Sequence, residues 1–255
     1  MYAEERQHAI ATLVAERGRV AVSAVADEFG VTTETVRRDL ALLERVGLLQ
    51  RVHGGAVPAG AFTLVEPGLA ERHGHRAESK RKIAAAALDL LPGNDGSLIL
   101  DGGSTTAALA DVLPADRRLY VATNSVPLAG RLSVAAGIRL HVLGGRVRGI
   151  TQTAVGESTI RALADLRTDV AFLGTNGIST THGFSTPDEA EAATKRAMTR
   201  AAQRVIVLAD SSKLGREHLI RFADVADIDA LVTDDEADPA LIAELEQQGL
   251  EVIVA

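Results

Sequence analysis

Apolar residues near the start of the chain recur at the spacing of an α-helix. Ile10, Leu13 and Val14 share one face of a predicted helix over residues 4–16, and Gly18 ends that helix. Charged residues separate the apolar positions, so the segment lacks the continuous apolar core of a signal peptide. The pattern predicts a helix with one buried face.

Two further helices are predicted, joined by a tight turn. Ser23 can cap a helix over residues 24–29, Gly30 supplies the turn, and Thr32 can cap a helix over residues 33–46. A helix, a short turn that contains glycine and a second helix form the helix-turn-helix pattern.

A β-hairpin is predicted directly after the second of these helices. Within the helix, Val36, Leu40 and Leu43 lie on one face, which we expect to be buried. Residues 48–52 and 56–57 are predicted as strands on either side of a Gly-Gly turn. The hairpin would be the wing of a winged helix-turn-helix.

The second part of the chain alternates short apolar runs with helical stretches. Helices are predicted over residues 81–91, 187–202 and 239–248, among others. This alternation indicates an α/β fold with a largely parallel sheet covered on both faces. The predicted strands are residues 97–100, 119–122, 138–143, 170–173, 205–208, 230–233 and 251–254.

The stretch between the two parts shows no long periodic pattern and is rich in glycine and proline. We predict a smaller domain over residues 1–58, a linker over residues 59–77 with a short strand near 62–65, and a larger domain over residues 78–255.

Composition narrows the functional classes. The 255 residues are 46% hydrophobic and 24% charged, which is ordinary for a soluble globular protein. The absence of cysteine excludes a disulfide framework, a thiolate metal site and a cysteine nucleophile. With no export signal and no apolar run of roughly 20 residues, we expect the cytoplasm.

The net charge of −7 argues against a nonspecific nucleic-acid coat. Residues 1–60 themselves hold seven arginines against eight acidic residues. If this part binds DNA, its positive charge must be concentrated on one face.

In a helix-turn-helix, the second helix enters the major groove. Its outward side chains include Arg37 and Arg38, which can bind guanine or neutralise phosphate. We expect Asp39 to orient these two arginines through salt bridges. A plain three-helix module with an arginine pair on a solvated face would give the same pattern. The predicted DNA-binding residues, wing included, are Thr32, Thr33, Glu34, Thr35, Arg37, Arg38, Arg51 and His53.

A glycine-rich turn follows the first predicted strand of the larger domain. Backbone N–H groups, hydroxyls and a helix N-terminus together can cradle a phosphate. The turn is neither a dinucleotide fingerprint nor a Walker A loop, and an ordinary tight turn fits it equally well. The turn consists of Asp101, Gly102, Gly103, Ser104, Thr105 and Thr106.

Polar turns also follow several other strands. Because ligands of open parallel sheets bind outside the carboxyl ends of the strands, these turns predict a small anionic polyol as ligand. A lysine can supply the charge that binds its phosphate. Taken singly, each residue also fits a turn former or a solvated charge. The further candidates are Asn124, Ser125, Gly144, Gly145, Thr175, Asn176, Gly177, Lys195 and Lys213.

Other constellations indicate no chemistry. His73 and His75 lack a nearby acidic ligand set, so no metal site is predicted. The acidic run 234–236 suits a helix N-terminus. Ser104 and Ser211 lack the histidine and acid of a hydrolase triad.

The chain resembles the DeoR family of bacterial regulators. The resemblance is carried by Arg6 and residues 31–40 and 53–56 in the first part, and by residues 183–188 and 208–213 in the second. It implies a DNA-binding regulator, commonly a repressor, that responds to phosphorylated sugars. It also implies a double-stranded DNA operator as partner and a homodimer or higher oligomer. Activation instead of repression stays open.

The family's C-terminal domain is Rossmann-like and similar in fold to ribose-5-phosphate isomerase. The resemblance places the isomerase's Gly-Ser-Thr loop at residues 102–106 and its aspartate-bearing loop at 175–177. Asn176 stands where catalysis needs a carboxylate, and an amide cannot act as a general base. We therefore predict a sensor that uses no cofactor; the alternative is an isomerase-like enzyme with an attached DNA-binding module.

Residues 1–6 and 53–58 further resemble the fructose-operon repressors of actinobacteria. This resemblance implies a fructose phosphate as the effector, which the pocket residues alone do not distinguish from another sugar phosphate.

Overall fold

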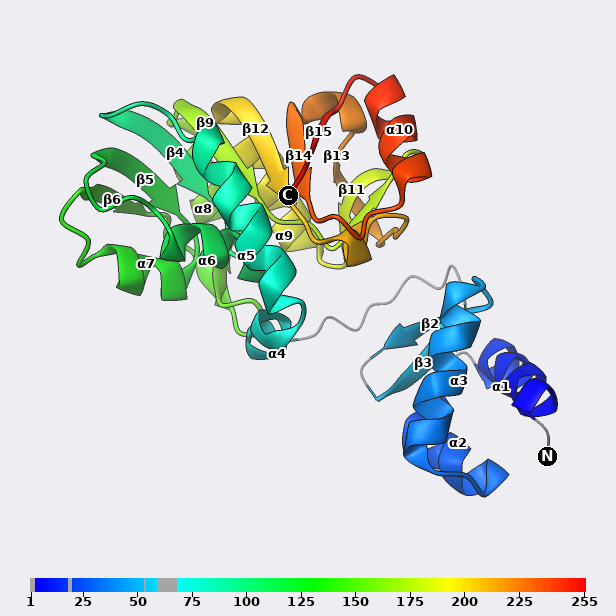
Figure 1. The fold of residues 1–255 in the computed structure, drawn as a ribbon. Helices are drawn as coiled ribbons and strands as arrows, with labels where there is room; N and C mark the ends of the chain where they lie inside the picture. Colours follow the sequence, from blue (N-terminus) through cyan, green and yellow to red (C-terminus); the bar gives the residue numbers. More distant parts are fainter. Residues whose placement is uncertain (1–2, 18–19, 53, 59–67) are drawn as a thin grey trace. The chain divides into compact units, whose positions relative to one another are not determined.

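The computed structural model describes residues 3–17, 20–52, 54–58 and 68–255. The chain divides into two compact units, Met1–Val65 and Glu66–Ala255 (Figure 1). Each unit has its own hydrophobic core. The strand expected near residues 62–65 lies outside the described residues, as does the part of the expected linker from 59 to 67.

The smaller unit is a winged helix-turn-helix. The three strands form an antiparallel sheet in the order β1-β3-β2. Glycine at position 30 adopts a left-handed conformation (φ 62°) and ends the first helix of the motif, as predicted. The elements are α1 (Ala3–Arg17), β1 (Val20–Ala21), α2 (Val22–Phe29), α3 (Thr33–Arg45), β2 (Leu49–Val52) and β3 (Gly55–Pro58).

Of the two helix caps predicted for the motif, one is present and the other is not. Thr32 caps α3, because its Oγ1 accepts a hydrogen bond from the backbone N–H of Thr35. The prediction that Ser23 caps α2 is wrong, since α2 begins at Val22. The backbone N–H of Val22 donates to Gly54 O at 2.7 Å, so the hairpin satisfies this donor without a side-chain cap.

A buried ion pair fastens α1 to α3. Arg6 Nε donates to Asp39 Oδ2 at 2.6 Å, and Gln7 Nε2 donates to Asp39 Oδ1 at 2.9 Å. The prediction that Asp39 orients Arg37 and Arg38 is therefore wrong. Asp39 lies on the inner side of α3, where the apolar residues predicted to be buried also lie, and its carboxylate fixes how α3 sits on α1.

The larger unit is built on a seven-stranded sheet in the order β15-β14-β12-β9-β4-β5-β6, with every neighbouring pair parallel (Figure 1). Each predicted strand is present. The strands are β4 (Gly96–Leu100), β5 (Leu119–Thr123), β6 (Ile138–Val142), β9 (Thr168–Leu173), β12 (Ala202–Leu208), β14 (Ala230–Thr233) and β15 (Glu251–Val254).

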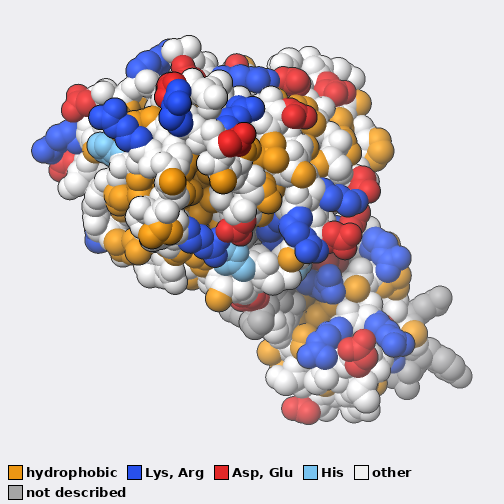
Figure 2. Space-filling model, turned by 60° about the vertical axis from the view of Figure 1, so that its left-hand side comes forward, with side chains coloured by type: hydrophobic (Ala, Val, Ile, Leu, Met, Phe, Trp, Pro, Cys, Tyr) orange, Lys and Arg blue, Asp and Glu red, His pale blue; other side chains and the backbone are white. Residues whose placement is uncertain are grey.

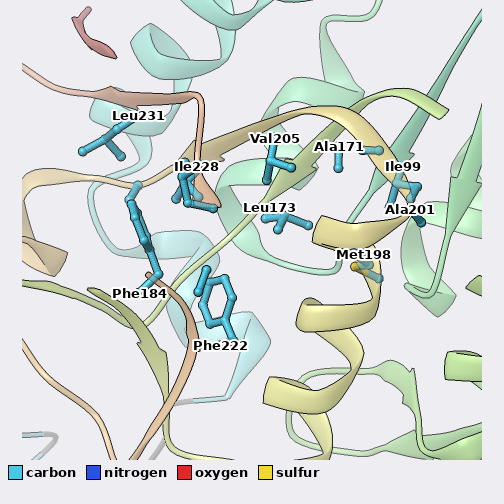
Figure 3. Packing of buried hydrophobic residues seen from close by; sticks show 14 of the residues in the cluster. Ile99, Ala171, Leu173, Phe184, Met198, Ala201, Val205, Phe222, Ile228 and Leu231 are labelled. Atoms are coloured by element: carbon cyan, nitrogen blue, oxygen red, sulfur yellow. The ribbon is translucent and has the colours of Figure 1, made fainter. Parts of the chain in front are cut away.

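Helices cover both faces of this sheet. Successive side chains of a strand point to opposite faces, so Ile99 joins one core cluster while Leu98 and Leu100 join the other. Figure 3 shows the first cluster, where Phe184 and Phe222 lie beside strand and helix residues. The helices are α4 (Leu69–Gly74), α5 (Ala77–Ala87), α6 (Ser104–Asp111), α7 (Val126–Leu132), α8 (Glu157–Ala164), α9 (Glu189–Arg200) and α10 (Pro239–Gln247).

Several short elements were not predicted. β10 (Gly177–Ser179), β11 (Gly183–Thr186) and β13 (Ile220–Ala223) form a small sheet of their own. β7 (Arg146–Arg148) and β8 (Thr153–Val155) form a hairpin. α4 lies within the stretch expected to be linker, and the 3-10 turns are η1 (Leu88–Leu90), η2 (Ser211–Lys213) and η3 (Val225–Asp227).

Loss of the buried pair should destabilise the smaller unit. Asp39→Ala leaves the buried guanidinium of Arg6 without its carboxylate, which costs about 3–5 kcal/mol. Glu28→Ala removes a partner from the exposed Arg17–Glu28 pair, for which we expect a much smaller loss because water screens the two charges. Urea unfolding of both variants measures the difference, and equal stabilities would contradict the assigned role of Asp39.

Candidate functional site

The first turn of α3 presents a polar surface. Thr32, Thr33, Glu34, Arg37 and Arg38 are exposed, whereas the apolar side of the helix is buried. The positive end of the helix dipole lies at the same turn. The predicted DNA-binding residues of this helix therefore share one accessible surface.

The two arginines of this surface remain available to a ligand. Glu34 lies 3.6 Å from Arg37 and 3.7 Å from Arg38, in pairs whose side chains are at least 60% exposed. Ion pairs at this exposure contribute little and exchange readily with water or phosphate. Glu34, not Asp39, is thus the carboxylate that lies beside the arginine pair.

The threonines differ in what they offer. The hydroxyl of Thr32 caps the helix and bonds the hydroxyl of Thr35 at 2.9 Å. Both hydroxyls are therefore engaged in starting α3, while Thr33 is exposed at the first helical position.

The wing contributes Arg51 on β2. Its backbone N–H and its Nε donate to the two carboxylate oxygens of Glu44, at 2.9 and 2.8 Å. This attachment couples the wing to α3. His53, also expected to contact DNA, lies outside the described residues.

A second polar site lies at the carboxyl edge of the seven-stranded sheet. The chain runs from β4 to β5 and β6 on one side and from β9 to β12, β14 and β15 on the other. β4 and β9 are neighbours, so the order of the strands reverses between them. In open α/β sheets, ligands bind in the crevice at this position.

Asp101 and Lys195 meet at the reversal point. Asp101, which follows β4, accepts a hydrogen bond from Gly174 N at 3.0 Å and forms an ion pair with the Lys195 ammonium. Lys195 also donates to Gly174 O at 2.9 Å. Both charged side chains are buried. The structure thus brings together two candidates that lie far apart in the sequence.

Gly102 is held between two other segments. Its N–H donates to Asn124 Oδ1 at 3.2 Å, and Asn124 Nδ2 donates to Ala154 O at 3.0 Å. A Cβ atom at position 102 would lie 2.0 Å from the methyl group of Thr153. Only glycine fits here, because the β7–β8 hairpin packs directly on this turn.

The rest of the glycine-rich turn leads into α6. Gly103 is extended, and the hydroxyl of Thr106 donates back to Gly103 O at 3.1 Å. Ser104 and Thr105 are largely buried. Neither side chain makes a hydrogen bond to another described residue. Their hydroxyls are free donors beside the helix N-terminus.

Sequence reasoning missed a cluster on the β7–β8 hairpin and α9. Glu191 Oε1 accepts from Thr153 Oγ1 and from Arg148, both at 3.2 Å. Arg148 also lies 2.9 Å from Asp188. Glu191 and Lys195 are four residues apart on α9, hence on the same side of the helix. That spacing could have linked Glu191 to Lys195 from the sequence, but nothing in the sequence indicated that the β7–β8 hairpin lies beside α9.

Other predicted residues serve the loops themselves. Ser125 caps α7 by accepting from Leu128 N. The hydroxyl of Thr175 donates to Gly177 O and Ser185 O, and Asn176 N donates to Ser185 O at 3.1 Å. These bonds fasten the turn after β9 to β11.

The glycines after β6 have a packing role. Thr159 of α8 donates to Gly144 O at 2.8 Å. A Cβ atom at Gly145 would lie 2.2 Å from Thr159 Oγ1. Gly145 thus allows α8 to approach the loop, whereas a Cβ atom at Gly144 would meet no atom within 4 Å. We assign neither glycine a ligand contact.

A group of cations surrounds the turn after β12. The Lys213 side chain of η2 forms no hydrogen bond or ion pair with any described residue. Burial lowers the pKa of the Lys213 ammonium; the carboxylate of Asp210 opposes that shift, and Arg72 and Arg76 reinforce it. Lys80, itself buried, lies 3.8 Å from Asp210. Positive charge thus exceeds negative charge around Lys213, which suits an anion.

The predicted absence of metal chemistry stays a prediction. Within the described ranges, no three His, Asp or Glu side chains group as metal ligands. Burial lowers the pKa values of His73 and His75. None of the described helices is long and apolar enough to cross a membrane.

A shallow hollow of about 790 Å³ lies at the opposite, amino edge of the sheet, lined in part by Asp169 and Asp229. Asp169 accepts from Ser97 N and Asp229 from Val205 N, both at 2.7 Å. These carboxylates tie neighbouring strands together, so the hollow offers no group for chemistry.

Comparisons with known proteins match both units. Residues 6–59 match the model of the DeoR-like helix-turn-helix domain, and residues 75–235 match that of the DeoR C terminal sensor domain. The lactose phosphotransferase system repressor of Streptococcus mutans is 34% identical, covering 94% of this chain and 96% of the relative. FruR of Bacillus subtilis, an uncharacterized HTH-type transcriptional regulator, is 35% identical, covering 92% and 93%.

Among solved structures, ribose 5 phosphate isomerase A from Neisseria gonorrhoeae is similar with a TM-score of 0.39 and 15% identity. The match covers 53% of this chain and 52% of that chain.

Substitution of the exposed arginines should weaken DNA binding without loss of stability. Arg37→Ala and Arg38→Ala should each cost about 1–3 kcal/mol of operator affinity if the arginine reads a base. If the arginine contacts a phosphate, its loss should instead reduce the salt dependence of the operator affinity. Fluorescence anisotropy with the chain's own upstream DNA measures this, and Arg17→Ala on α1 is the control. Wild-type operator affinity in both α3 variants would show that this surface does not contact the DNA.

Gly102→Ala should disrupt the sensor site. The new methyl group would overlap the methyl of Thr153, at a cost of about 1–3 kcal/mol. Thr153→Ser removes that methyl, so the double variant should recover most of the lost stability. Thermal unfolding measures both, and a double variant no more stable than Gly102→Ala would contradict the packing assigned to this turn.

Proposed function

The chain belongs to the DeoR family of transcriptional regulators, and we propose that it represses a carbohydrate-utilisation operon until a phosphorylated sugar releases it from DNA. The DNA-binding half rests on α3 and its exposed arginine pair. The sensing half rests on the carboxyl edge of the sheet.

The observation that carries the sensing half is the surplus of cations around Lys213. The Lys213 ammonium is half-buried and forms no hydrogen bond or ion pair with a described residue, which is unfavourable, and an anion with several acceptor oxygens would compensate it. Lys80 lies 3.8 Å from Asp210, near enough to Lys213 for the two ammonium groups to repel, and adds charge. We assign the phosphate of the effector to this turn, with the free hydroxyls of Ser104 and Thr105 as further donors.

The remaining hydroxyls of a sugar would face the reversal point. Asp101 and Glu191 offer carboxylate oxygens, and Asn124 and Thr153 offer polar groups that can both donate and accept. Such a set suits a polyol better than an apolar ligand. The resemblance of residues 1–6 and 53–58 to fructose-operon repressors favours a fructose phosphate, which we propose as the first effector to test.

One chain carries one recognition helix. Regulators of this type place two such helices on two half-sites, about one helical turn of DNA apart. We therefore propose that a homodimer or higher oligomer binds the operator. We also propose a cytoplasmic location, where the protein would meet chromosomal DNA.

A sugar-phosphate isomerase is the second candidate, favoured only by the polar site on an isomerase-like fold. Catalysis at that site needs a general base, which Asn176 cannot supply. The two carboxylates of the site are engaged, Asp101 by Lys195 and Glu191 by Arg148 and Thr153. We expect no turnover of ribose 5-phosphate or of a ketose phosphate. A coupled isomerase assay on the purified chain tests this directly.

The decisive experiment titrates the chain onto its upstream DNA at fixed salt and then adds sugar phosphates. Fructose 1-phosphate, fructose 1,6-bisphosphate and glycerol 3-phosphate form the panel. Release by one compound supports the repressor and identifies its effector. Specific binding that none of them affects would refute the sensing half and leave the DNA-binding half standing.

Lys213→Met should separate effector binding from folding. We expect at least about a tenfold loss of effector affinity, since a charge-assisted bond contributes about 1.5–3 kcal/mol. We also expect a higher melting temperature, because the variant no longer holds a half-buried ammonium that lacks a hydrogen-bond partner among the described residues.

Lys82→Met is the matched control, since Lys82 is an exposed lysine of α5 paired with Asp235. Its effector affinity, measured by calorimetric titration, and its melting temperature should both stay close to those of the wild type. Equal effector affinities in the two variants would contradict the role of Lys213.

A further inference from the structure

α4 is the first element that the structure describes after residues 59–67, which follow the last strand of the helix-turn-helix unit. Any displacement that travels along the chain from the sensor unit to α3 must therefore pass through α4. The helix has only six residues, so its position depends on what holds its two ends.

The start of α4 is bonded to the β7–β8 hairpin. Leu69 N donates to Ile150 O at 3.0 Å, in the turn between the two strands. The same hairpin carries Thr153, which packs on Gly102, bridges to Ser125 and donates to Glu191. A ligand that displaces the hairpin thus acts on the first residue of α4.

The end of α4 is bonded to a lysine of α5. The Lys80 ammonium donates to the carbonyl oxygens of Arg72 and His75, two of the acceptors that a helix end leaves unsatisfied. The same ammonium faces Asp210 at 3.8 Å, in the turn that leads to Lys213. Lys80 is therefore shared between the end of α4 and the edge of the anion site.

The residue that joins α4 to α5 adopts an unusual conformation. Arg76 has a φ of 52°, in the left-handed region that side chains disfavour. Its guanidinium donates to Ser211 Oγ at 2.6 Å and pairs with Glu236. The turn after β12 thus holds the corner between the two helices in a strained arrangement.

We propose that α4 relays effector binding to the DNA-binding unit, through its bond to the β7–β8 hairpin at one end and through Lys80 and Arg76 at the other. This inference rests on the proposed function, because it takes the polar edge of the sheet as the effector site. Without effector, the bonds at both ends hold α4 in the arrangement that binds DNA. An anion at Lys213 attracts Lys80 and Arg76, draws them from their present partners, and releases the corner.

Leu69 permits a test in which a single hydrogen bond is removed. It is the first residue of α4, where proline is tolerated, and Gly68 before it has the extended conformation that proline requires. Leu69→Pro loses the N–H to Ile150 together with the buried side chain. Leu69→Ala loses the side chain and keeps the N–H, so it is the matched control.

The expected result is that Leu69→Pro behaves as if effector were already bound. Its operator Kd should rise about tenfold or more above that of Leu69→Ala, within the usual range of allosteric coupling. Addition of fructose 1-phosphate, or whichever probe of the panel releases the wild type, should change it less than threefold. By linkage, it should bind that probe at least as tightly as Leu69→Ala. Identical operator affinities and identical release in the two variants would overturn the proposal.

Arg76→Gly provides a second variant if proline impairs folding. Glycine accepts the left-handed conformation freely, and the substitution removes the side-chain bonds to Ser211 after β12 and to Glu236 after β14. It should lower operator affinity, as Leu69→Pro does, whereas Arg81→Ala on the exposed side of α5 should not. Wild-type operator affinity in Arg76→Gly would argue against the relay.

The operator affinities are measured without effector, so they remain informative if no sugar phosphate binds. Release of the wild type by none of the probes would refute the sensing half of the proposed function. A difference between Leu69→Pro and Leu69→Ala would still support the relay, and no difference would still refute it.

Discussion

The reversal of strand order between β4 and β9 is the constraint on which the sensor unit depends. In open α/β sheets, ligands bind in the crevice at such a reversal, at the carboxyl edge. Asp101 and Lys195 form a buried ion pair at this position. Because each buried charge would be costly alone, the pair holds the end of β4, the end of β9 and α9 in one register.

The smaller unit also contains a buried ion pair, which has a different role. Arg6 and Asp39 are buried between α1 and α3, and their geometry sets the angle at which α3 is presented. Replacement of such a pair by apolar residues is often neutral for stability, so its advantage lies in orientation. A recognition helix needs that advantage, since its exposed side chains must reach base edges in a groove of fixed width.

The sequence predicted the elements whose pattern is dictated by burial on all sides. The seven strands of the main sheet are apolar runs because both faces are covered by helices. The three-residue strands β7, β8 and β10 were missed, since so few residues carry no periodicity. Asp39 was misassigned because its neighbours in sequence are arginines, whereas its partner Arg6 comes from another helix. Arg148 and Glu191 escaped notice for the same reason: only the fold brings the hairpin onto α9.

Charge distribution explains how an acidic chain can bind two anions. The net charge of −7 repels nucleic acid from most of the surface, and Figure 2 shows acidic and basic side chains interspersed over the face that it draws. Attraction is then confined to places where cations outnumber the carboxylates beside them. In the smaller unit this place is the first turn of α3, and in the larger unit it is the surroundings of Lys213. Acidic residues elsewhere weaken nonspecific binding more than specific binding, because only specific binding adds base contacts to the phosphate contacts. The acidity of the chain therefore favours discrimination between the operator and other DNA.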